Sequence, residues 1–307
     1  MLQRRTLTNA RLLRAVTGFT REEIDQMLPA FGHAYQDALQ TAAIKRGPRR
    51  RRPGGGRTGQ IPAVWDKLIF ILVYVHVYPI QEIQGFLFGL SQTQASDWAI
   101  RLLPVLRAAL KREMALPARR PATMADLAAH CPDLFFLLDA TERTIRRPGD
   151  SVQQKAHYSG KKKRHTVKNT VLCDQQGRRV LYVGETTRGS MHDKTLAEAD
   201  APPFPPHSQG AADLGYQGYK PPNLQLTIPI KKPKGGELTD AEKALNTALA
   251  KKRIFVEHAI RGIKRQRIAA EIFRNTSAGM IDLSIEVAAG LFNLTNQYRE
   301  QPTARVA

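Results

Sequence analysis

The sequence predicts a helical region followed by an α/β domain with a mixed five-stranded sheet. Up to about residue 120, apolar residues recur at helical spacing and are interrupted by Gly and Pro. Beyond it, short strand-like apolar runs alternate with helical segments, which is the order of an α/β domain. The 307 residues, 42% of them hydrophobic, suffice for two or three cores, or for one large one.

The net charge and the longest apolar stretch indicate whether the partner is nucleic acid or a membrane. The 47 Lys and Arg against 27 Asp and Glu give a net charge of +20, which favours nucleic acid, with an anionic membrane as the rival. The stretch "LIFILVYVHVY" at 68–78 is well short of the roughly 20 residues of a spanning helix. No secretory h-region is visible. We therefore expect a cytoplasmic protein without a membrane partner.

The two cysteines, Cys131 and Cys173, form no CxxC pair. This spacing predicts neither a disulfide framework nor a zinc ribbon, so we expect two core thiols.

The N-terminal segment, residues 1–48, is predicted to be helical. Over residues 20–44, Thr20 and Glu23 have capping-box spacing ahead of an apolar face. Residues 49–62 follow as a basic Arg/Gly linker that contains Arg50, Arg51 and Arg52. We expect this linker to lie along nucleic-acid phosphates or in a minor groove, and a solvated tether is the alternative.

Residues 63–120 suit a helix-turn-helix DNA-binding domain. Gly89 can end one helix, and Ser91 with Gln94 can cap the next, which also carries Arg101. The preceding segment at 68–78 is equally strand-like because it is rich in Val and Ile. A three-helix packing domain without groove contacts is the alternative.

Residues 121–300 are predicted as one α/β domain. Strand candidates lie at 133–141, 163–174 and 178–186, and "DQQG" at 174–177 is a natural hairpin turn. A short helix at 192–200, a strand that runs into a turn over 210–219, a strand at 226–233 and a long helix from about 240 to 267 follow. Three strands, helix, two strands and a long helix is the pattern of an RNase H-like fold.

Two carboxylates are expected to meet at one edge of this sheet. In "LFFLLDAT", at 134–141, Asp139 ends the first strand, and Asp213 ends the fourth. If these strands are parallel neighbours, the two anions lie together and need a shared proton or a cation. Mg²⁺ takes oxygen ligands and leaves room for phosphates. Asp193 is the rival of Asp213, although as the first residue of a helix it also suits an N-cap.

The long helix offers a third carboxylate. In "KKRIFVEHAIRGIK", at 251–264, Arg253, Glu257 and Lys264 fall within roughly 40° on a helical wheel, apart from an apolar face. Glu257 can therefore point at the sheet edge with a cation on each side. An ordinary solvated pair with Arg253 is the alternative.

Four segments now carry a resemblance: "DAT" at 139–141, "HYSGKKKRHTVK" at 157–168, "ADLGYQGY" at 212–219 and R-x3-E-x6-K at 253–264. Together they resemble the DDE transposases of the IS5-like group of bacterial insertion sequences, which are related to Harbinger-type elements. One departure is Ala250, where the family often has a Tyr three residues before the Arg. That departure puts a base-stacking role of the Tyr in doubt.

The resemblance implies an RNase H-like domain in which Asp139, Asp213 and Glu257 form a DDE triad that holds two Mg²⁺ ions, with Mn²⁺ as a substitute. It implies hydrolysis at the end of the element and then attack of the freed 3′-OH on target DNA. Expected partners are double-stranded DNA, with terminal inverted repeats and a target site, and a second copy of the chain. A bacterial cytoplasmic location on the nucleoid follows.

Phosphate contacts are expected from Arg253, Lys264 and the basic run Lys161, Lys162, Lys163 and Arg164. Accessory candidates are His192, Asp193 and Tyr216. His192 is expected to be structural or a DNA contact, because the neighbourhood lacks further zinc ligands. Tyr216 either stacks on an extruded base or packs against the sheet.

Two other functions fit the same sequence. One is a domesticated transposase that binds specific DNA without catalysis, which would have no need for three converging acids on a basic surface. The other is an RNase H-like nuclease acting on RNA or hybrids, which leaves the helix-turn-helix unexplained.

Overall fold

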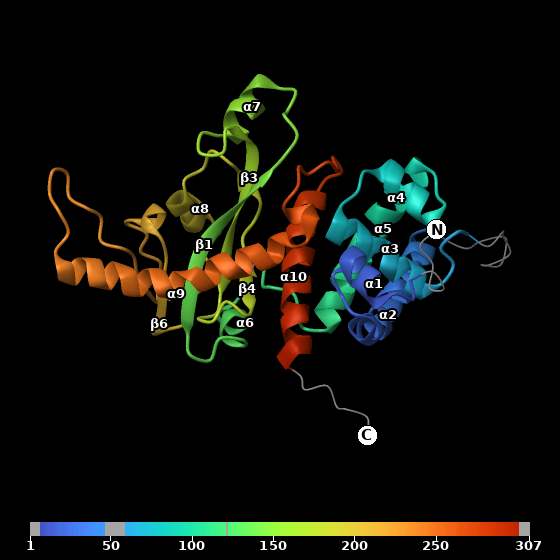
Figure 1. The fold of residues 1–307 in the computed structure, drawn as a ribbon, viewed down its shortest axis with the longest axis horizontal. Helices are drawn as coiled ribbons and strands as arrows, with labels where there is room; N and C mark the ends of the chain where they lie inside the picture. Colours follow the sequence, from blue (N-terminus) through green and yellow to red (C-terminus); the bar gives the residue numbers. More distant parts are fainter. Residues whose placement is uncertain (1–6, 47–58, 121, 301–307) are drawn as a thin grey trace. The chain divides into compact units, whose positions relative to one another are not determined.

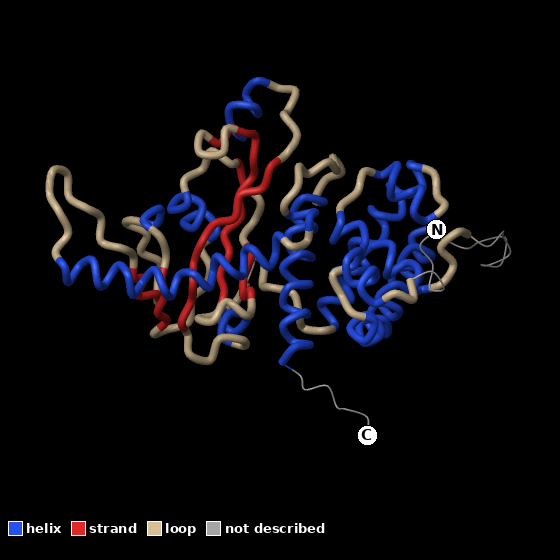
Figure 2. Tube along the Cα trace, viewed as in Figure 1, coloured by secondary structure: helices blue, strands red, loops and turns tan. Residues whose placement is uncertain are grey.

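The computed structural model describes residues 7–46, 59–120 and 122–300, and these form two compact units (Figures 1 and 2). The helical unit comprises the described residues up to Leu116, residues 266–268 and those from Ala278 onwards. The sheet unit comprises 117–265 and 269–277. Arg50, Arg51 and Arg52 lie outside the described residues. Within the described ranges, no helix has the length and apolarity to span a membrane.

The helical unit is built from α1 (Ala10–Thr17), α2 (Arg21–Arg46), α3 (Val64–Val77), α4 (Gln81–Phe88), α5 (Gln92–Arg112) and α10 (Met280–Glu300). The predicted capping box is confirmed: Thr20 N donates to Glu23 Oε2 (2.7 Å) and Glu23 N to Thr20 Oγ1 (3.3 Å). The ambiguous segment at 68–78 is helical in α3 up to Val77. Its apolar residues are buried on nearly all sides, which a run of Val and Ile allows in a core helix.

The turn between α4 and α5 is formed as predicted. Gly89 adopts the left-handed conformation (φ 68°) that ends α4. Ser91 Oγ accepts from Gln94 N, and Gln94 Oε1 accepts from Ser91 N. Two consecutive helices joined by this short turn are therefore present.

The last helix packs in the helical unit, against α5. Asn293 Nδ2 donates to Ala115 O (2.8 Å), and Arg107 pairs with Glu286 (2.8 Å). The predicted catalytic range of 121–300 thus includes a helix that packs elsewhere, because this contact joins segments far apart in sequence. The other predicted boundaries stay predictions.

The strands of the sheet unit are β1 (Phe135–Thr144), β2 (Tyr158–Ser159), β3 (Arg164–Cys173), β4 (Val180–Val183), β5 (Thr187–Arg188), β6 (Ser208–Ala211) and β7 (Leu224–Thr227). Its helices are α6 (Met124–Ala128), α7 (Ser151–His157), α8 (Asp193–Asp200) and α9 (Asp240–Lys264), with the 3₁₀ turns η1 (Leu214–Tyr216) and η2 (Arg267–Ala269), of which η2 runs from the helical unit into this one. Cys131 and Cys173 are buried free thiols, as expected.

The sheet is mixed, as predicted. From one edge to the other, its main strands lie in the order β4-β3-β1-β6-β7. The pairs β4–β3 and β3–β1 are antiparallel, whereas β1–β6 and β6–β7 are parallel. The predicted hairpin turn is present, with Gly177 N donating to Asp174 O (3.0 Å).

Three predicted strand ends are wrong, and one of them is that of the fifth strand, expected over 226–233, which is β7 and ends at Thr227. β1 continues past Asp139 to Thr144, because its second half stays paired with β3. The fourth strand, expected over 210–219, is β6, which ends at Ala211. It stops there because Asp213 caps η1, whose turn removes the backbone from the sheet.

Helices cover both faces of the sheet. Phe136 and Leu138 point to the face where α8 and η1 contribute Ala197 and Tyr216 to one buried cluster. On the other face, the long helix α9 packs across β1 (Figure 1). Asp139 points to the α9 face by strand alternation.

A buried carboxylate joins α8 to the sheet. Asp200 accepts hydrogen bonds from Thr170 Oγ1 on β3 and from Glu185 N (3.1 Å). Gly184 is part of this contact, since a Cβ atom built on it would lie 1.9 Å from Asp200 Oδ2. The position therefore requires glycine for steric reasons.

Gly184→Ala is expected to lower the free energy of unfolding by about 1–3 kcal/mol, because either the backbone or Asp200 has to move. Gly149→Ala is the control, since a Cβ atom there has no neighbour within 4 Å. Urea denaturation of both variants measures the difference. Equal stabilities would show that Gly184 is not tightly enclosed.

Candidate active site

Asp139 lies where two parallel strands part. β1 and β6 are paired from Phe135 and Gln209 to Leu137 and Ala211, and β6 ends there. Asp139 and Asp213 each lie two residues beyond this last pair, and the charge of Asp213 acts on Asp139. Asp139 remains fixed on its other side by the pairing of β1 with β3.

Asp193 joins this pair. Asp213 Oδ1 accepts from Gly215 N (2.8 Å) and thereby caps η1. A Cβ atom on Gly215 would lie 2.9 Å from Asp213 Oδ1 and 3.1 Å from Asp193 Oδ2. The two carboxylates therefore flank the same glycine. We call Asp139, Asp193 and Asp213 the acidic cluster.

The predicted capping role of Asp193 is wrong. His192 is the N-cap residue of α8, without a side-chain cap, and is exposed. The carboxylate of Asp193 instead pairs with Lys168 on β3 (3.1 Å), whose Nζ also donates to Met191 O (2.9 Å). Lys168 was not singled out from the sequence, although it ends the segment "HYSGKKKRHTVK". Its partner is 25 residues away, and no local pattern indicates that contact.

Burial raises the pKa of Asp139 to about 6. A hydrogen bond from Ala140 N (2.7 Å) opposes this shift. The charges of Asp213 and Asp193 raise the pKa further, whereas that of Arg253 lowers it. An ionised Asp139 in this place is therefore unfavourable unless a cation is nearby.

The cationic flank of α9 faces the acidic cluster. Arg253 is half-buried, and its charge acts on Asp139. Lys264 Nζ donates to Glu142 O on β1 (3.1 Å), and burial lowers the pKa of this lysine. Glu257 is on the same flank by helical spacing, but its side chain is exposed.

Glu257 belongs to α9, a different element from those that carry the three aspartates. Within the described residues, no group of three or more His, Cys, Asp or Glu side chains is arranged to hold a metal ion. Asp213 and Asp193 flank the same glycine and the charges of both act on Asp139, but the three aspartates are not arranged as a ready metal site. The triad is a prediction that these contacts do not test.

The groups around Asp139 nevertheless suit a divalent cation. Carboxylate oxygens are the ligands that hard divalent ions prefer. Two buried donors nearby, the Tyr216 hydroxyl and Arg253 Nε, have no hydrogen-bond partner among the described residues. Donors of this kind can serve carboxylates whose orientation a bound ion has fixed.

A basic pocket lies beside the α9 flank. Its volume is about 320 Å³, and its lining is Glu142, Thr144, Lys162, Arg164, Thr166, Lys264 and Ala270. Three cations against one carboxylate favour an anionic ligand. The basic run was predicted on a strand, but Lys161, Lys162 and Lys163 form the turn after β2, and β3 begins at Arg164.

In the helical unit, the residues predicted to contact DNA are Gln94 and Arg101. Gln94 uses its side-chain oxygen in the cap of α5. Arg101 is exposed, with its guanidinium 4.9 Å from the centre of the Trp98 ring.

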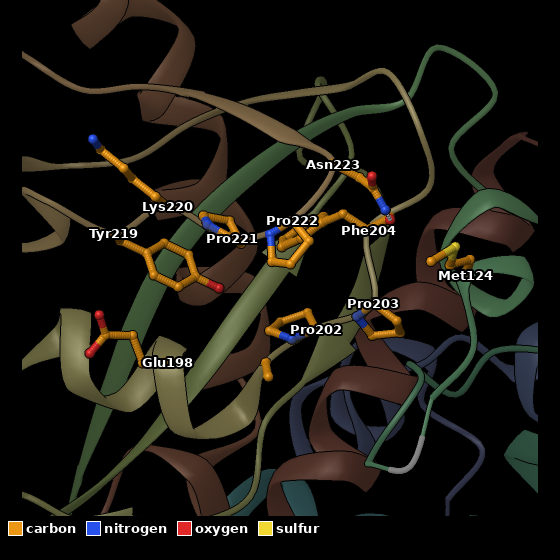
Figure 3. A pocket seen from close by; sticks show the side chains of 11 residues that line it. Met124, Glu198, Pro202, Pro203, Phe204, Tyr219, Lys220, Pro221, Pro222 and Asn223 are labelled. Atoms are coloured by element: carbon orange, nitrogen blue, oxygen red, sulfur yellow. Dashed lines mark hydrogen bonds between the residues drawn. The ribbon is translucent and has the colours of Figure 1, made fainter.

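A second pocket of the sheet unit is apolar (Figure 3). It measures about 340 Å³ and is lined by Met124, Glu198, Ala201, Pro202, Pro203, Phe204, Tyr219, Lys220, Pro221, Pro222 and Asn223. This lining does not include the acidic cluster. Tyr219 also belongs to the core, where its hydroxyl donates to Ala197 O (3.3 Å).

Comparison with known proteins agrees with the predicted resemblance. A curated protein of Microchaete diplosiphon, "Probable transposase for insertion sequence element IS702", is 26% identical over 284 residues, which cover 92% of this chain and 94% of that protein. No solved structure matches the chain significantly. Residues 138–293, just over half of the chain, match the family described as DDE superfamily endonuclease. That segment contains Asp139, Asp213 and Glu257, and the chain belongs to the DDE superfamily endonuclease family.

Proposed function

We propose that this enzyme is the transposase of an insertion sequence, which cleaves DNA at the ends of its element and joins the freed strand to target DNA. The observation that carries the proposal is the juxtaposition of Asp139 and Asp213 where β1 and β6 part. The name of the similar Microchaete protein, a probable transposase of an insertion sequence element, supports the same function. The acidic cluster on a strongly basic chain suits a site that handles phosphates.

An RNase H-like fold is part of this proposal. The strand order β4-β3-β1-β6-β7, antiparallel on one side of β1 and parallel on the other, supports it. The long helix α9 on the face of β1 to which Asp139 points supports it further.

We propose Mg²⁺ as the natural cofactor, two ions per site, with Mn²⁺ as a substitute. Asp139 and Asp213 would hold the ions, and Glu257 would complete the set from α9. Such ions supply an activated attacking oxygen and stabilise the leaving oxygen in an in-line displacement at phosphorus. Arg253, half-buried beside Asp139, would then neutralise a flanking phosphate.

The DNA backbone is proposed to enter through the basic pocket. Lys162 and Arg164 are exposed at its rim, and Lys264 is half-buried in it. Phosphate contacts of this kind give affinity and register without reading bases. Lys161 and Lys163, in the same turn, would extend the path.

In the helical unit, we propose that α4 and α5 form a helix-turn-helix that reads the terminal inverted repeats. Arg101 would contact DNA, whereas Gln94 contributes less because its oxygen caps α5. A homodimer on two ends, and a place on the bacterial nucleoid, complete the proposal. Arg50, Arg51 and Arg52 would add minor-groove contacts.

Asp213→Asn is expected to abolish Mg²⁺-dependent cleavage of DNA that carries the element's own ends, by roughly a hundredfold or more. Asp193→Asn is expected to cost less, because Asp193 is already paired with Lys168. Asp240→Asn is the control, a fully exposed carboxylate at the start of α9. Nicking assays with DNA and RNA substrates measure the loss.

Equal losses for Asp193→Asn and Asp213→Asn would contradict the assignment of Asp213. Wild-type DNA binding without any cleavage would favour the non-catalytic alternative. Cleavage of RNA or hybrids without end specificity would favour the RNase H-like nuclease.

The pKa of Asp139 predicts a pH-dependent stability without metal. A folded pKa of about 6 against 3.8 means that the native state holds the proton more tightly, so stability falls as pH rises through this interval. At pH 7.5 the penalty is about 3 kcal/mol, and at pH 5 about half of that. Asp139→Asn is therefore expected to raise metal-free stability more at pH 7.5 than at pH 5.

Urea denaturation at the two pH values, with EDTA, measures this difference. Asp240→Asn is again the control, since its carboxylate is exposed. A stability gain independent of pH would show that Asp139 is not held at a raised pKa.

Lys162→Gln is expected to weaken DNA binding at low salt and to reduce the slope of log K against log salt by about 0.9, the value for one phosphate contact. Lys243→Gln is the matched control, because Lys243 is paired with Asp240 near the start of α9. Fluorescence anisotropy over a salt series measures both slopes. Identical slopes would exclude Lys162 from the DNA path.

A further inference from the structure

We propose that Tyr216 is a positioning residue whose hydroxyl donates a hydrogen bond to a carboxylate of the acidic cluster when a divalent cation is bound. The hydroxyl thereby fixes which carboxylate oxygen faces the ion. This inference rests on the proposed metal site and adds a residue to it.

Tyr216 is held rigidly next to Gly215, the glycine that two members of the cluster, Asp213 and Asp193, flank. This tyrosine is the last residue of η1, the 3₁₀ turn over Leu214–Tyr216 whose N-cap residue is Asp213. Its side chain is fully buried in the core with Phe136 and Leu138. The ring of Tyr219 packs at 6.2 Å between centroids. The phenol cannot turn away from the cluster without breaking this packing.

The hydroxyl of Tyr216 is a buried donor without a partner among the described residues. Such a group is costly, so native structures rarely contain one without a reason. Burial raises the pKa of Tyr216 well above its ordinary value, and the charges of Asp139, Asp193 and Asp213 raise it further, in that order. The phenol thus stays protonated and neutral, and the negative charges of all three carboxylates act on it.

One oxygen of each carboxylate already accepts a hydrogen bond from another donor. Asp139 Oδ1 accepts from Ala140 N, Asp193 Oδ1 from Lys168 Nζ and Asp213 Oδ1 from Gly215 N. A cation that binds one oxygen of a carboxylate leaves the other oxygen to accept from a fixed donor. Partners of this kind typically change metal affinity by 10–100-fold.

Tyr182 provides a matched comparison. Its side chain is also buried, and its hydroxyl also lacks a partner within the described ranges. The charges that act on it are those of Asp200, Arg119, Arg120 and Glu185, none of which belongs to the acidic cluster. Removing either hydroxyl deletes one buried, unsatisfied oxygen, but only Tyr216 adjoins the cluster.

The test compares Mn²⁺ binding to the full-length wild type, Tyr216→Phe and Tyr182→Phe without DNA, with free Mn²⁺ followed by electron paramagnetic resonance. Tyr216→Phe is expected to raise the Kd for Mn²⁺ about tenfold, and Tyr182→Phe to leave it unchanged. Metal-free thermal unfolding is expected to be similar for the two variants. A Kd of Tyr216→Phe within twofold of the Tyr182→Phe value would overturn the inference.

A second measurement titrates the wild-type protein with Mg²⁺, and a variant serves only to assign the signal. The chain has eight tyrosines, and labelling them with 3-fluorotyrosine gives a ¹⁹F signal for Tyr216 that Tyr216→Phe removes from the spectrum. Mg²⁺ is expected to shift this signal in the wild type and to leave that of Tyr182 in place. A Tyr216 signal that does not move while Mg²⁺ binds would also overturn the inference.

The variant Asp213→Asn distinguishes a failure of the proposed metal site from a failure of the proposed role of Tyr216. If the wild type binds no Mn²⁺, the proposed metal site fails and the role of Tyr216 fails with it. If the wild type binds Mn²⁺, Asp213→Asn does not, and Tyr216→Phe binds as the wild type does, only the role of Tyr216 fails.

Discussion

The feature on which the site depends is the parting of β1 and β6. Up to Leu137 and Ala211 the two strands satisfy each other's backbone groups, and beyond that point β6 leaves the sheet. The gap exposes one side of Asp139 while β3 still holds its backbone. A carboxylate in such a place is rigid and poorly solvated at once, which suits a ligand and is unfavourable for an isolated anion.

The surrounding residues reduce the cost of the acidic cluster without neutralising it. Lys168 pairs with Asp193, and Arg253 brings a positive charge to Asp139. Asp213 accepts a hydrogen bond from the Gly215 amide. A divalent ion would balance the negative charge that remains on the acidic cluster. A sheet with a purely structural role would have no reason to keep such a cluster.

Much of this arrangement was predictable from local patterns. The capping boxes at Thr20 and Ser91 and the turn at Gly177 depend on residues close in sequence, and all are confirmed. The extent of β1 was not predictable, because its second half is held by pairing with β3. The same applies to Asp193, whose helix-start position suggested a cap but whose carboxylate lies across from Lys168.

The packing of the last helix and the position of Glu257 also depend on distant contacts. Helical spacing correctly grouped the cations of α9 with Glu257 on one flank, and Arg253 and Lys264 do face β1. The helical spacing of these residues does not predict how deeply their side of α9 is buried. The rotation of α9 is set instead by the apolar residues that it presses onto the sheet.

Those apolar contacts bear on how Glu257 could join the cluster. Val256, Ala259 and Ile263 are completely buried. Because successive residues are about 100° apart, rotating α9 enough to bury Glu257 would expose Val256, at about 1.5–3 kcal/mol for a side chain of that size. A change of the Glu257 rotamer costs far less, since its side chain is exposed. The proposed metal ligation by Glu257 would therefore need only a change of its side-chain rotamer, with α9 in place.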